Sequence, residues 1–433
     1  MKNLSAGLEK LQRLTFHYFL DHTSNSTGLV ADSTRSGSPS SIAAVGLGLT
    51  AYVVGAERGF LPRRDAVARI LKVLQFLESS PQGPGDDVTG HRGFYYHFLD
   101  MTSGRRAGRC ELSTIDSTYV LIGALVAAAY FTADNAGERE IRVVADRLYR
   151  RADWRWAQNG RPTLTHGWRP EKGFLRYRWE GYSEGLLSYI LGLGSPTYPL
   201  DAQSYPAWTR TYRWKKLYGI EFLFAGPLFI HQLPQVWLDL RGIQDAPMRQ
   251  KGLDYFENSR RATLVQQEYT IRNSRGLKAY GEHVWGITAS DGPGPARRRI
   301  KGVARRFLGY AARGIPYGPD DGTIAPWAVV ASLPFAPELV IPTLNRIDEL
   351  YPSLTSKYGF KCSVNPTFPD PSTPSGVWVS QGYYGLDQGP IVMMIENYRS
   401  ELIWRLLRHC PYIVRGIQRA GFTGGWLGQV KSS

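Results

Sequence analysis

The 433-residue chain contains little cysteine, and none in an arrangement typical of a structural site. Cys110, Cys362 and Cys410 are odd in number and far apart in the sequence, so they predict neither a disulfide framework nor a zinc site. The eight histidines show no ligand spacing, and no P-loop, GxSxG elbow or HExxH motif occurs. We therefore expect neither a metal ion nor a cofactor.

The chain also lacks a long apolar run. No stretch of 18 or more apolar residues is present, so we expect no membrane-spanning helix. The opening residues, MKNLSAGLEKLQRLTFHYFL, form an amphipathic helix pattern without the continuous apolar core of a signal peptide. This pattern is expected of a cytoplasmic protein as written, or of a periplasmic or secreted one whose signal has been removed. The oligomeric state stays open.

Acidic residues are fewer than basic ones, 37 against 52, and the formal net charge is +15. Such a balance suggests an anionic partner. The densest cationic stretch, residues 297–306, lies beside Gly and Pro and belongs to no nucleic-acid-binding motif, so we expect no nucleic-acid partner and interpret it as a solvated surface. An anion-binding surface protein is an alternative that rests on the charge alone.

Apolar segments rich in Gly, Ala and Ser recur along the chain and are typical of buried helices. They comprise residues 41–57, 115–131, 182–193, 229–240, 322–331 and 389–408. Amphipathic segments follow most of them, at 62–78, 137–150, 245–271, 337–351 and 411–419. After the third apolar segment, only residues 207–218 could supply the outer helix.

Long loops precede the apolar segments, and strand-like patterns occur within them at residues 93–100 and 173–182. Short connections within the helix pairs favour antiparallel neighbours. The pattern therefore predicts an all-α toroid of helical hairpins, with small β-hairpins, as a single domain over residues 1–433. All the long loops would then gather at the N-terminal ends of the inner helices.

Carboxylates stand at or near these same helix ends, among them Asp116, Glu184 and Asp387. For a single aspartate, capping of the free helix N–H groups is a sufficient explanation. Glu184 is harder to explain in this way, because its position reads as inside a helix and among Trp179 and Tyr182. Aromatic surroundings desolvate a carboxyl group and favour its neutral form, which is what a general acid requires near neutral pH.

A carboxylic acid, a second carboxylate and many aromatic residues in a loop-lined cleft are typical of a glycoside hydrolase. Aromatic rings would stack on pyranose faces, and polar side chains would bind hydroxyl groups. The alternative is a carbohydrate-binding toroid without catalysis, in which the acids only cap helices. The predicted substrate-binding residues are Trp179, Tyr182, Arg178, His231, Gln232, Arg260, Trp285, Asp291, Asp321, Trp327, Tyr383 and Tyr384.

Motifs spread over nearly the whole chain resemble the glucoamylase-like bacterial domain and related glycoside hydrolases that act on β-1,2-glucans. They include GYSEGLLSYILGLGSPTYPL (181–200), YGEHVWGITASDGPG (280–294), DDGTIAPWAVVASLPFAPE (320–338) and YYGLDQGPIVMMIENYRS (383–400). That group contains endo-β-1,2-glucanases and the cyclising domain of cyclic β-1,2-glucan synthases. The resemblance implies an (α/α)6 barrel and a hydrolase or transglycosylase acting on a β-linked glucan, most specifically β-1,2-glucan. Anionic substituents on such a glucan would also account for the basic charge.

The resemblance also implies roles for individual carboxylates. Glu184 looks like the general acid, and Asp387 looks like the carboxylate on the opposite side of the cleft, the base in inverting relatives. Asp116 is a further acidic candidate. In relatives that retain the anomeric configuration, a later glutamate is the nucleophile, and Glu268 and Glu282 are both candidates for that position.

Three further polar residues, Glu396, Asn397 and Arg399, occur in the same apolar segment as Asp387. Glu396 is nine residues from Asp387, which is about 13.5 Å along a helix axis. The two carboxyl groups are therefore not expected to share a site. We predict that Glu396, Asn397 and Arg399 form a buried structural network.

Overall fold

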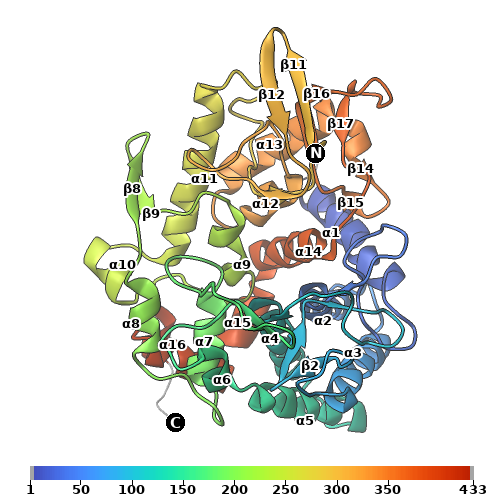
Figure 1. Ribbon diagram of the computed structural model, residues 1–433, viewed down its shortest axis with the longest axis vertical. Helices are drawn as coiled ribbons and strands as arrows, with labels where there is room; N and C mark the ends of the chain where they lie inside the picture. Colours follow the sequence, from blue (N-terminus) through green and yellow to red (C-terminus); the bar gives the residue numbers. More distant parts are fainter. Residues whose placement is uncertain (1–3, 430–433) are drawn as a thin grey trace.

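The computed structural model describes residues 4–429, and most of the regular structure is helical (Figure 1). The longer helices are α1 (Leu4–Asp21), α2 (Ile42–Glu57), α3 (Arg63–Ser79), α4 (Thr114–Tyr130), α5 (Ala136–Arg151), α7 (Leu186–Gly194), α9 (Phe229–Trp237), α11 (Tyr255–Arg272), α13 (Pro337–Leu350), α14 (Gly385–Ser400) and α16 (Pro411–Arg419). Shorter ones are α6 (Trp154–Gln158), α8 (Ser204–Thr209), α10 (Ala246–Lys251), α12 (Pro326–Ala331), α15 (Leu402–Arg408) and the 3-10 turns Pro352–Leu354 and Gly425–Gln429.

The six apolar segments predicted as inner helices overlap α2, α4, α7, α9, α12 and α14, and these helices are buried on nearly all faces. α2 packs against α4 and α14, α4 against α7, and α12 against α9 and α14. The contact between α2 and α4 is close because glycine is present on both helices. A Cβ atom on Gly46 would lie 2.2 Å from the backbone carbonyl of Tyr119, and one on Gly123 would lie 2.3 Å from the carbonyl oxygen of Gly46.

Amphipathic helices pack on the outside of this group: α1 on α14, α3 on α2, α5 on α4, α11 on α9 and α13 on α12. The prediction for the third pair is wrong, because residues 207–218 contain only the end of α8 and the short strand Trp214–Leu217. The helix that packs against α7 is instead α16, from the C-terminal part of the chain. Gly194 and Gly416 allow this contact, since a Cβ atom on either would lie about 2 Å from a backbone carbonyl of the facing helix.

Two predicted helices are each divided by a residue in the left-handed region. The segment 245–271 breaks at Gly252 (φ +63°) into α10 and α11. The segment 389–408 breaks at Glu401 (φ +58°) into α14 and α15. A positive φ ends the α-helical hydrogen-bond pattern, so neither segment can be one continuous helix.

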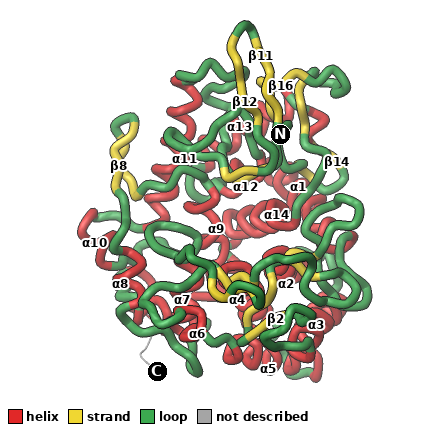
Figure 2. The backbone as a smooth tube through the Cα atoms, in the orientation of Figure 1, coloured by secondary structure: helices red, strands yellow, loops and turns green. Residues whose placement is uncertain are grey.

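The strands are short, and most of them lie in the long connections between helices (Figure 2). Those numbered β2, β3, β5, β6 and β7 form one antiparallel five-stranded sheet in that order, and the others pair in twos. The predicted small hairpins are therefore an incomplete description. The strands are β1 (Ser40–Ser41), β2 (Gly90–His91), β3 (Phe94–Tyr96), β4 (Phe98–Leu99), β5 (Leu112–Ser113), β6 (Gly167–Arg169), β7 (Gly173–Phe174), β8 (Trp214–Leu217), β9 (Ile220–Leu223), β10 (Ala289–Ser290), β11 (Ala296–Ile300), β12 (Val303–Phe307), β13 (Ala311–Ala312), β14 (Thr355–Ser356), β15 (Gly359–Phe360), β16 (Val364–Pro369) and β17 (Val377–Val379).

The carboxylate of Glu396 lies at the centre of the predicted buried network. It is fully buried and accepts hydrogen bonds from Nη2 and Nε of Arg58, at 2.6 and 2.7 Å, and from Gln12 at 3.0 Å. Arg399 donates to the side-chain oxygen of the same Gln12, and Asn397 donates to the carbonyl of Val236. The prediction of a structural network is confirmed, and it joins α1, α2, α9 and α14.

Replacing Arg58 should lower the free energy of unfolding more than replacing Glu396 does. The Arg58 side chain is 23% exposed, whereas that of Glu396 is 0% exposed. Removing Arg58 strands a buried charge, while removing the charge of Glu396 leaves an arginine that can reach water. We expect Arg58→Met to lower the free energy of unfolding by about 3 kcal/mol and Glu396→Gln by about 1–2 kcal/mol. Urea denaturation measures both, and equal losses would contradict this asymmetry.

Candidate active site

A cavity of about 500 Å³ opens where the N-terminal ends of inner helices meet the long loops. Residues at the starts of α2, α4, α9, α12 and α14 line it, together with side chains from the loops before them. The loops therefore gather at the predicted helix ends. The ionisable residues of the lining are Asp32, Arg35, His97, Glu111, Asp116, Tyr119, His166, Glu184, Tyr310 and Tyr384.

Glu184 lies on the cavity wall just before α7, not inside a helix as predicted. Its backbone carbonyl accepts from the N–H of Leu187, so it stands at the entry to the first turn. The hydroxyl of Tyr119, from α4, donates to its carboxyl oxygen Oε2. Burial raises the pKa of Glu184 to about 7, the Tyr119 hydrogen bond opposes this shift, and the charge of Asp116 adds to it.

His97 forms the centre of a charged cluster beside Glu184. Its Nδ1 lies 2.9 Å from Glu111 Oε1 and 3.6 Å from Asp116 Oδ2. Burial lowers the pKa of His97, but the charges of Asp116, Glu111 and Asp32 outweigh burial and raise the pKa to about 9. The hydrogen bond from His97 in turn lowers the pKa of Glu111 to about 2. At neutral pH this part of the wall therefore holds an imidazolium between carboxylates.

Asp387 lies in the first turn of α14 and is only 2% exposed. Burial raises the pKa of its carboxyl group well above the usual value. Cys362 opposes this shift, and the charges of Asp32 and Asp291 add to it. Its Oδ2 atom has no hydrogen-bond partner among the described residues. Asp387 is thus packed behind the lining, whereas its neighbour Leu386 reaches the cavity.

The charge of Asp32 acts on both His97 and Asp387. Burial and the charge of Asp116 raise the pKa of Asp32, whereas His97 lowers it. Sequence reasoning missed Asp32, because it lies in a loop without hydrophobic periodicity. Sequence reasoning also missed His97 and Glu111, which come from short strands or their flanks. Tyr119 could have been found, because it is three residues after Asp116 and therefore on the same helix face.

Three of the predicted aromatic residues, Trp179, Trp327 and Tyr384, line the cavity. Trp179 stacks on His166 with ring centroids 3.9 Å apart, and its indole N–H donates to Thr114. The Trp179 ring is therefore held in place before any ligand binds.

Other predicted binding residues lie outside the cavity lining and make internal contacts. Tyr182 bonds with His231, whose pKa burial lowers to about 4, and Gln232 donates to the carbonyl of Ala328 and to Ser332. These contacts, with the burial of Trp285 and Tyr383, account for the polar and aromatic content of these segments by packing.

The predicted arginines and two glutamates are also placed away from the cavity. Arg178 donates to backbone carbonyls of Gln158 and Thr163, and Arg260 pairs with Glu338. Glu268 lies on α11, 3.5 Å from Arg272, with its side chain 39% exposed. The Glu282 side chain is 68% exposed and nearest to His283. A nucleophile must reach the substrate, so the structure favours neither glutamate for that role.

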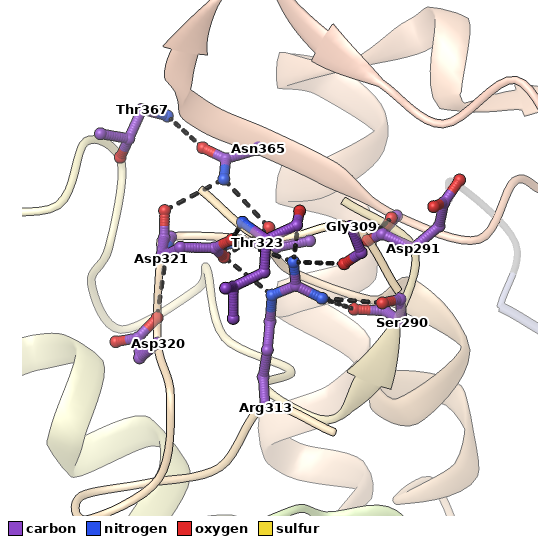
Figure 3. Close-up of polar contacts among 12 residues, drawn as sticks. Ser290, Asp291, Gly309, Arg313, Asp320, Asp321, Thr323, Asn365 and Thr367 are labelled. Carbon is purple, nitrogen blue, oxygen red and sulfur yellow. Dashed lines mark hydrogen bonds and ion pairs between the residues drawn. The ribbon is translucent and has the colours of Figure 1, made fainter. Parts of the chain in front are cut away.

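Asp291 and Asp321 both have structural partners, and Figure 3 shows those of Asp321. Asp321 receives two hydrogen bonds from the fully buried Arg313, at 2.8 and 2.9 Å, and its pKa is lowered because this pairing outweighs burial. Asp291 accepts from Arg35 at 2.9 Å and from Ser380 at 3.1 Å. Together they attach the loop around Tyr310 to the rest of the wall.

No group of three or more His, Cys, Asp or Glu side chains within residues 4–429 is placed to hold a metal ion. No helix in the same part of the chain has both the length and the apolar character to cross a bilayer. Cys110, Cys362 and Cys410 are all free.

The fold is helix-rich, and carboxyl groups and aromatic rings line a cavity at the N-terminal ends of its helices. This combination is typical of glycoside hydrolases. More particularly, the Glycoamylase family model, described as "Putative glucoamylase", matches residues 176–411, and the chain belongs to this family. A protein of the same description from Bacteroides uniformis is 32% identical, with a TM-score of 0.85 over 97% of this chain and 98% of that one.

Two other relatives carry more specific names. The endo-β-1,2-glucanase of Chitinophaga pinensis, solved with sophorotriose and glucose, is 27% identical, with a TM-score of 0.85 over 98% of this chain and 100% of that one. The exo β-1,2-glucooligosaccharide sophorohydrolase of Parabacteroides distasonis is 29% identical over 95% of this chain. The present chain spans 57% of the length of that relative.

The hydrogen bond from Tyr119 should lower the pKa of Glu184, against the effect of burial. Because the hydroxyl stabilises the ionised carboxylate, Tyr119→Phe should raise this pKa by about one unit. Carbon-13 NMR of protein labelled at the glutamate carboxyl groups measures the titration, with the Glu184 signal assigned from its loss in Glu184→Gln. Tyr182→Phe is the matched control, because the Tyr182 hydroxyl contacts His231 instead. An unchanged or lowered pKa in Tyr119→Phe would contradict the assignment.

Proposed function

We propose that the protein is a glycoside hydrolase or transglycosylase that cleaves β-1,2-glucan. The observation that carries this proposal is the desolvated carboxyl group of Glu184, whose pKa of about 7 keeps much of it protonated at neutral pH. A general acid for a glycosidic oxygen needs this protonation state. The names of the relatives from C. pinensis and P. distasonis support the β-1,2 linkage.

We further propose that the inner and outer helices form an (α/α)6 barrel and that residues 1–433 are one catalytic domain. The packing of α1, α3, α5, α11 and α13 on inner helices supports an alternating arrangement. The endo-β-1,2-glucanase of Talaromyces funiculosus, 13% identical with a TM-score of 0.66 over 100% of this chain, is similar in fold alone. In a barrel of this kind the cavity lies at one end of the inner ring, where the long loops meet.

In the proposed reaction, Glu184 protonates the leaving glycosidic oxygen. Tyr119 holds Oε2 of the carboxyl group, so the proton would be carried on Oε1, the oxygen without that bond. As the proton leaves, the Tyr119 hydroxyl and the nearby His97 imidazolium stabilise the carboxylate that forms. The cavity also provides rings for stacking on pyranose faces, namely Trp179, Trp327 and Tyr384.

Asp387 is the proposed base, acting through a water molecule because it lies behind the lining. Its burial makes its ionised form a stronger base than an exposed aspartate. An unpaired buried oxygen, Oδ2, is consistent with a proton-accepting role. Asp116 Oδ2 lies 3.6 Å from His97 Nδ1, and the proposed role of Asp116 is electrostatic.

Replacing the acid should strongly lower turnover while the fold survives. We expect Glu184→Gln to lower kcat on β-1,2-glucooligosaccharides by about 10³-fold, with an unchanged melting temperature. The matched controls are Glu268→Gln and Glu282→Gln, which remove carboxylates outside the cavity and should stay within twofold of the parent. Turnover by Glu184→Gln at the parental rate would refute the assignment. Oligosaccharide binding without turnover by the parent protein would favour the carbohydrate-binding alternative.

The same assay distinguishes the role of Asp387 from that of Asp116. Asp387→Asn should lower kcat by about 10²-fold or more, and Asp116→Asn by about tenfold, because only the first removes the proposed base. Proton NMR of the first product then gives its anomeric form, which should be inverted if a water molecule attacks. A larger loss in Asp116→Asn, or a retained anomer, would remove Asp387 from the role of base.

A further inference from the structure

The hairpin β11–β12 concentrates positive charge in a short segment. Residues 296–307, ARRRIKGVARRF, hold six cationic side chains and no acidic one; we call this segment the basic arm. In the strand register Arg297 is opposite Arg306 and Arg298 is opposite Arg305. Like charges at directly opposed positions destabilise a hairpin, so this pattern works against the fold of the arm itself.

The protein provides little compensation for this repulsion. Arg298 lies over the ring of Phe368 at 4.2 Å, and Arg305 donates to the carbonyls of Arg275 and Gly276. The other four cations, Arg297, Arg299, Lys301 and Arg306, are exposed. None of the six is within 4.0 Å of a carboxylate among the described residues. Arg299 also donates to the carbonyl of Gly302 in the turn of the arm, but it stays exposed, so four exposed cations are available to an outside anion.

The arm is a direct extension of the cavity wall. It is the loop between β10 and β13, which pair with each other, and Ala289 of β10 and Tyr310 beside β13 both line the cavity. Tyr310 is 55% exposed as well, which places it at the cavity mouth. A ligand that extends out of the cavity past Tyr310 would therefore lie next to the base of the arm.

The base of the arm is also held in a fixed position. Arg313 donates to the carbonyls of Ser290, Leu308 and Gly309, which lie on both sides of the arm, and to Asp321 (Figure 3). Asp321 also accepts from the N–H of Leu308. A Cβ atom on Gly294 would lie 2.2 Å from the carbonyl oxygen of Phe307, so the two strands leave the wall in close contact.

Five residues per strand give the arm a reach of about 17 Å. Figure 1 shows it projecting at the upper end of the molecule, beyond the neighbouring elements. We propose that the basic arm binds anionic substituents, of phosphate or carboxylate type, on the part of the saccharide chain that extends from the cavity. Guanidinium groups suit such anions because they can donate two parallel hydrogen bonds. This inference rests on the proposed function, since it assigns a class of substrate to the same site.

An anionic lipid surface would be attracted by the same charge, but the arm is a poorer match for it. Its turn, Lys301–Gly302, carries no aromatic residue, and Val303 is the large apolar side chain exposed there. The aromatic residues near the arm instead lie at its base. There the ring centroids of Tyr310 and Tyr384 are 6.0 Å apart, and both residues line the cavity. This placement fits a ligand shared between the cavity and the arm.

The test compares neutral β-1,2-glucan with the same glucan sparsely succinylated. At low ionic strength the parent protein should show kcat/KM about tenfold higher for the succinylated form, through a lower KM, and the advantage should fall with added salt. The variant Arg297→Gln/Arg299→Gln/Lys301→Gln/Arg306→Gln should lose this advantage and keep the parental rate on neutral glucan. Its melting temperature at low salt should equal or exceed that of the parent, because opposed like charges are removed.

A matched control removes four exposed cations outside the arm, Arg161, Arg210, Arg405 and Arg415, and should retain the preference. Equal kcat/KM of the parent protein for both glucans, or equal loss in the control, would overturn the proposal. Arm-dependent binding to phosphatidylglycerol vesicles without a preference for succinylated glucan would also overturn it, in favour of a lipid surface. If neither glucan is cleaved, the proposed function fails. In that case the arm is tested by gel retardation. Gels that contain succinylated glucan should retard the parent protein but not the arm variant, and gels that contain neutral glucan should retard neither.

Discussion

The close contact between α2 and α4 is the constraint on which the candidate site depends. Gly46 leaves no room for a side chain against the backbone of Tyr119, and Gly123 brings α4 equally close to Gly46. This contact fixes the position of α4, and α4 carries both Tyr119 and Asp116 to the cavity wall. The hydrogen bond that holds Glu184 therefore depends on the close packing of these two helices. A chain with larger residues at these two positions would have to move the tyrosine.

Burial and pairing give the carboxyl groups around the cavity different protonation states. Glu184 and Asp387 have raised pKa values because burial penalises their charge. Glu111 has a lowered pKa because His97 donates a hydrogen bond to it. Carboxyl groups of raised and of lowered pKa therefore coexist in one cavity at one pH, and the acid role of Glu184 depends on its raised value. The helix N-termini position these groups, but burial and the His97 charge differentiate them.

The sequence predicted the parts of the fold that depend on long, regular patterns. Inner helices such as α2 and α4 could be found because every face is apolar over many residues, and Glu184 because aromatic residues surround it in the sequence. The five-stranded sheet could not be found, because strands of two or three residues show no alternation. The pairing of α16 with α7 was also hidden, since it joins segments more than two hundred residues apart. Tyr182, Arg178 and Arg260 show the corresponding limit for sites, because internal packing uses the same residue types as sugar binding.

The buried pair of Arg313 and Asp321 connects the two functional proposals physically. A fully buried arginine is costly unless all its donors are used, and Arg313 satisfies this condition by bonding to backbone carbonyls on either side of the basic arm as well as to Asp321. The same bonds orient the segment that places Tyr310 at the cavity mouth. A charge that would be unfavourable alone thus positions the cavity wall and the arm as one unit. This rigidity is what would allow an anion bound on the arm to affect where the saccharide lies relative to Glu184.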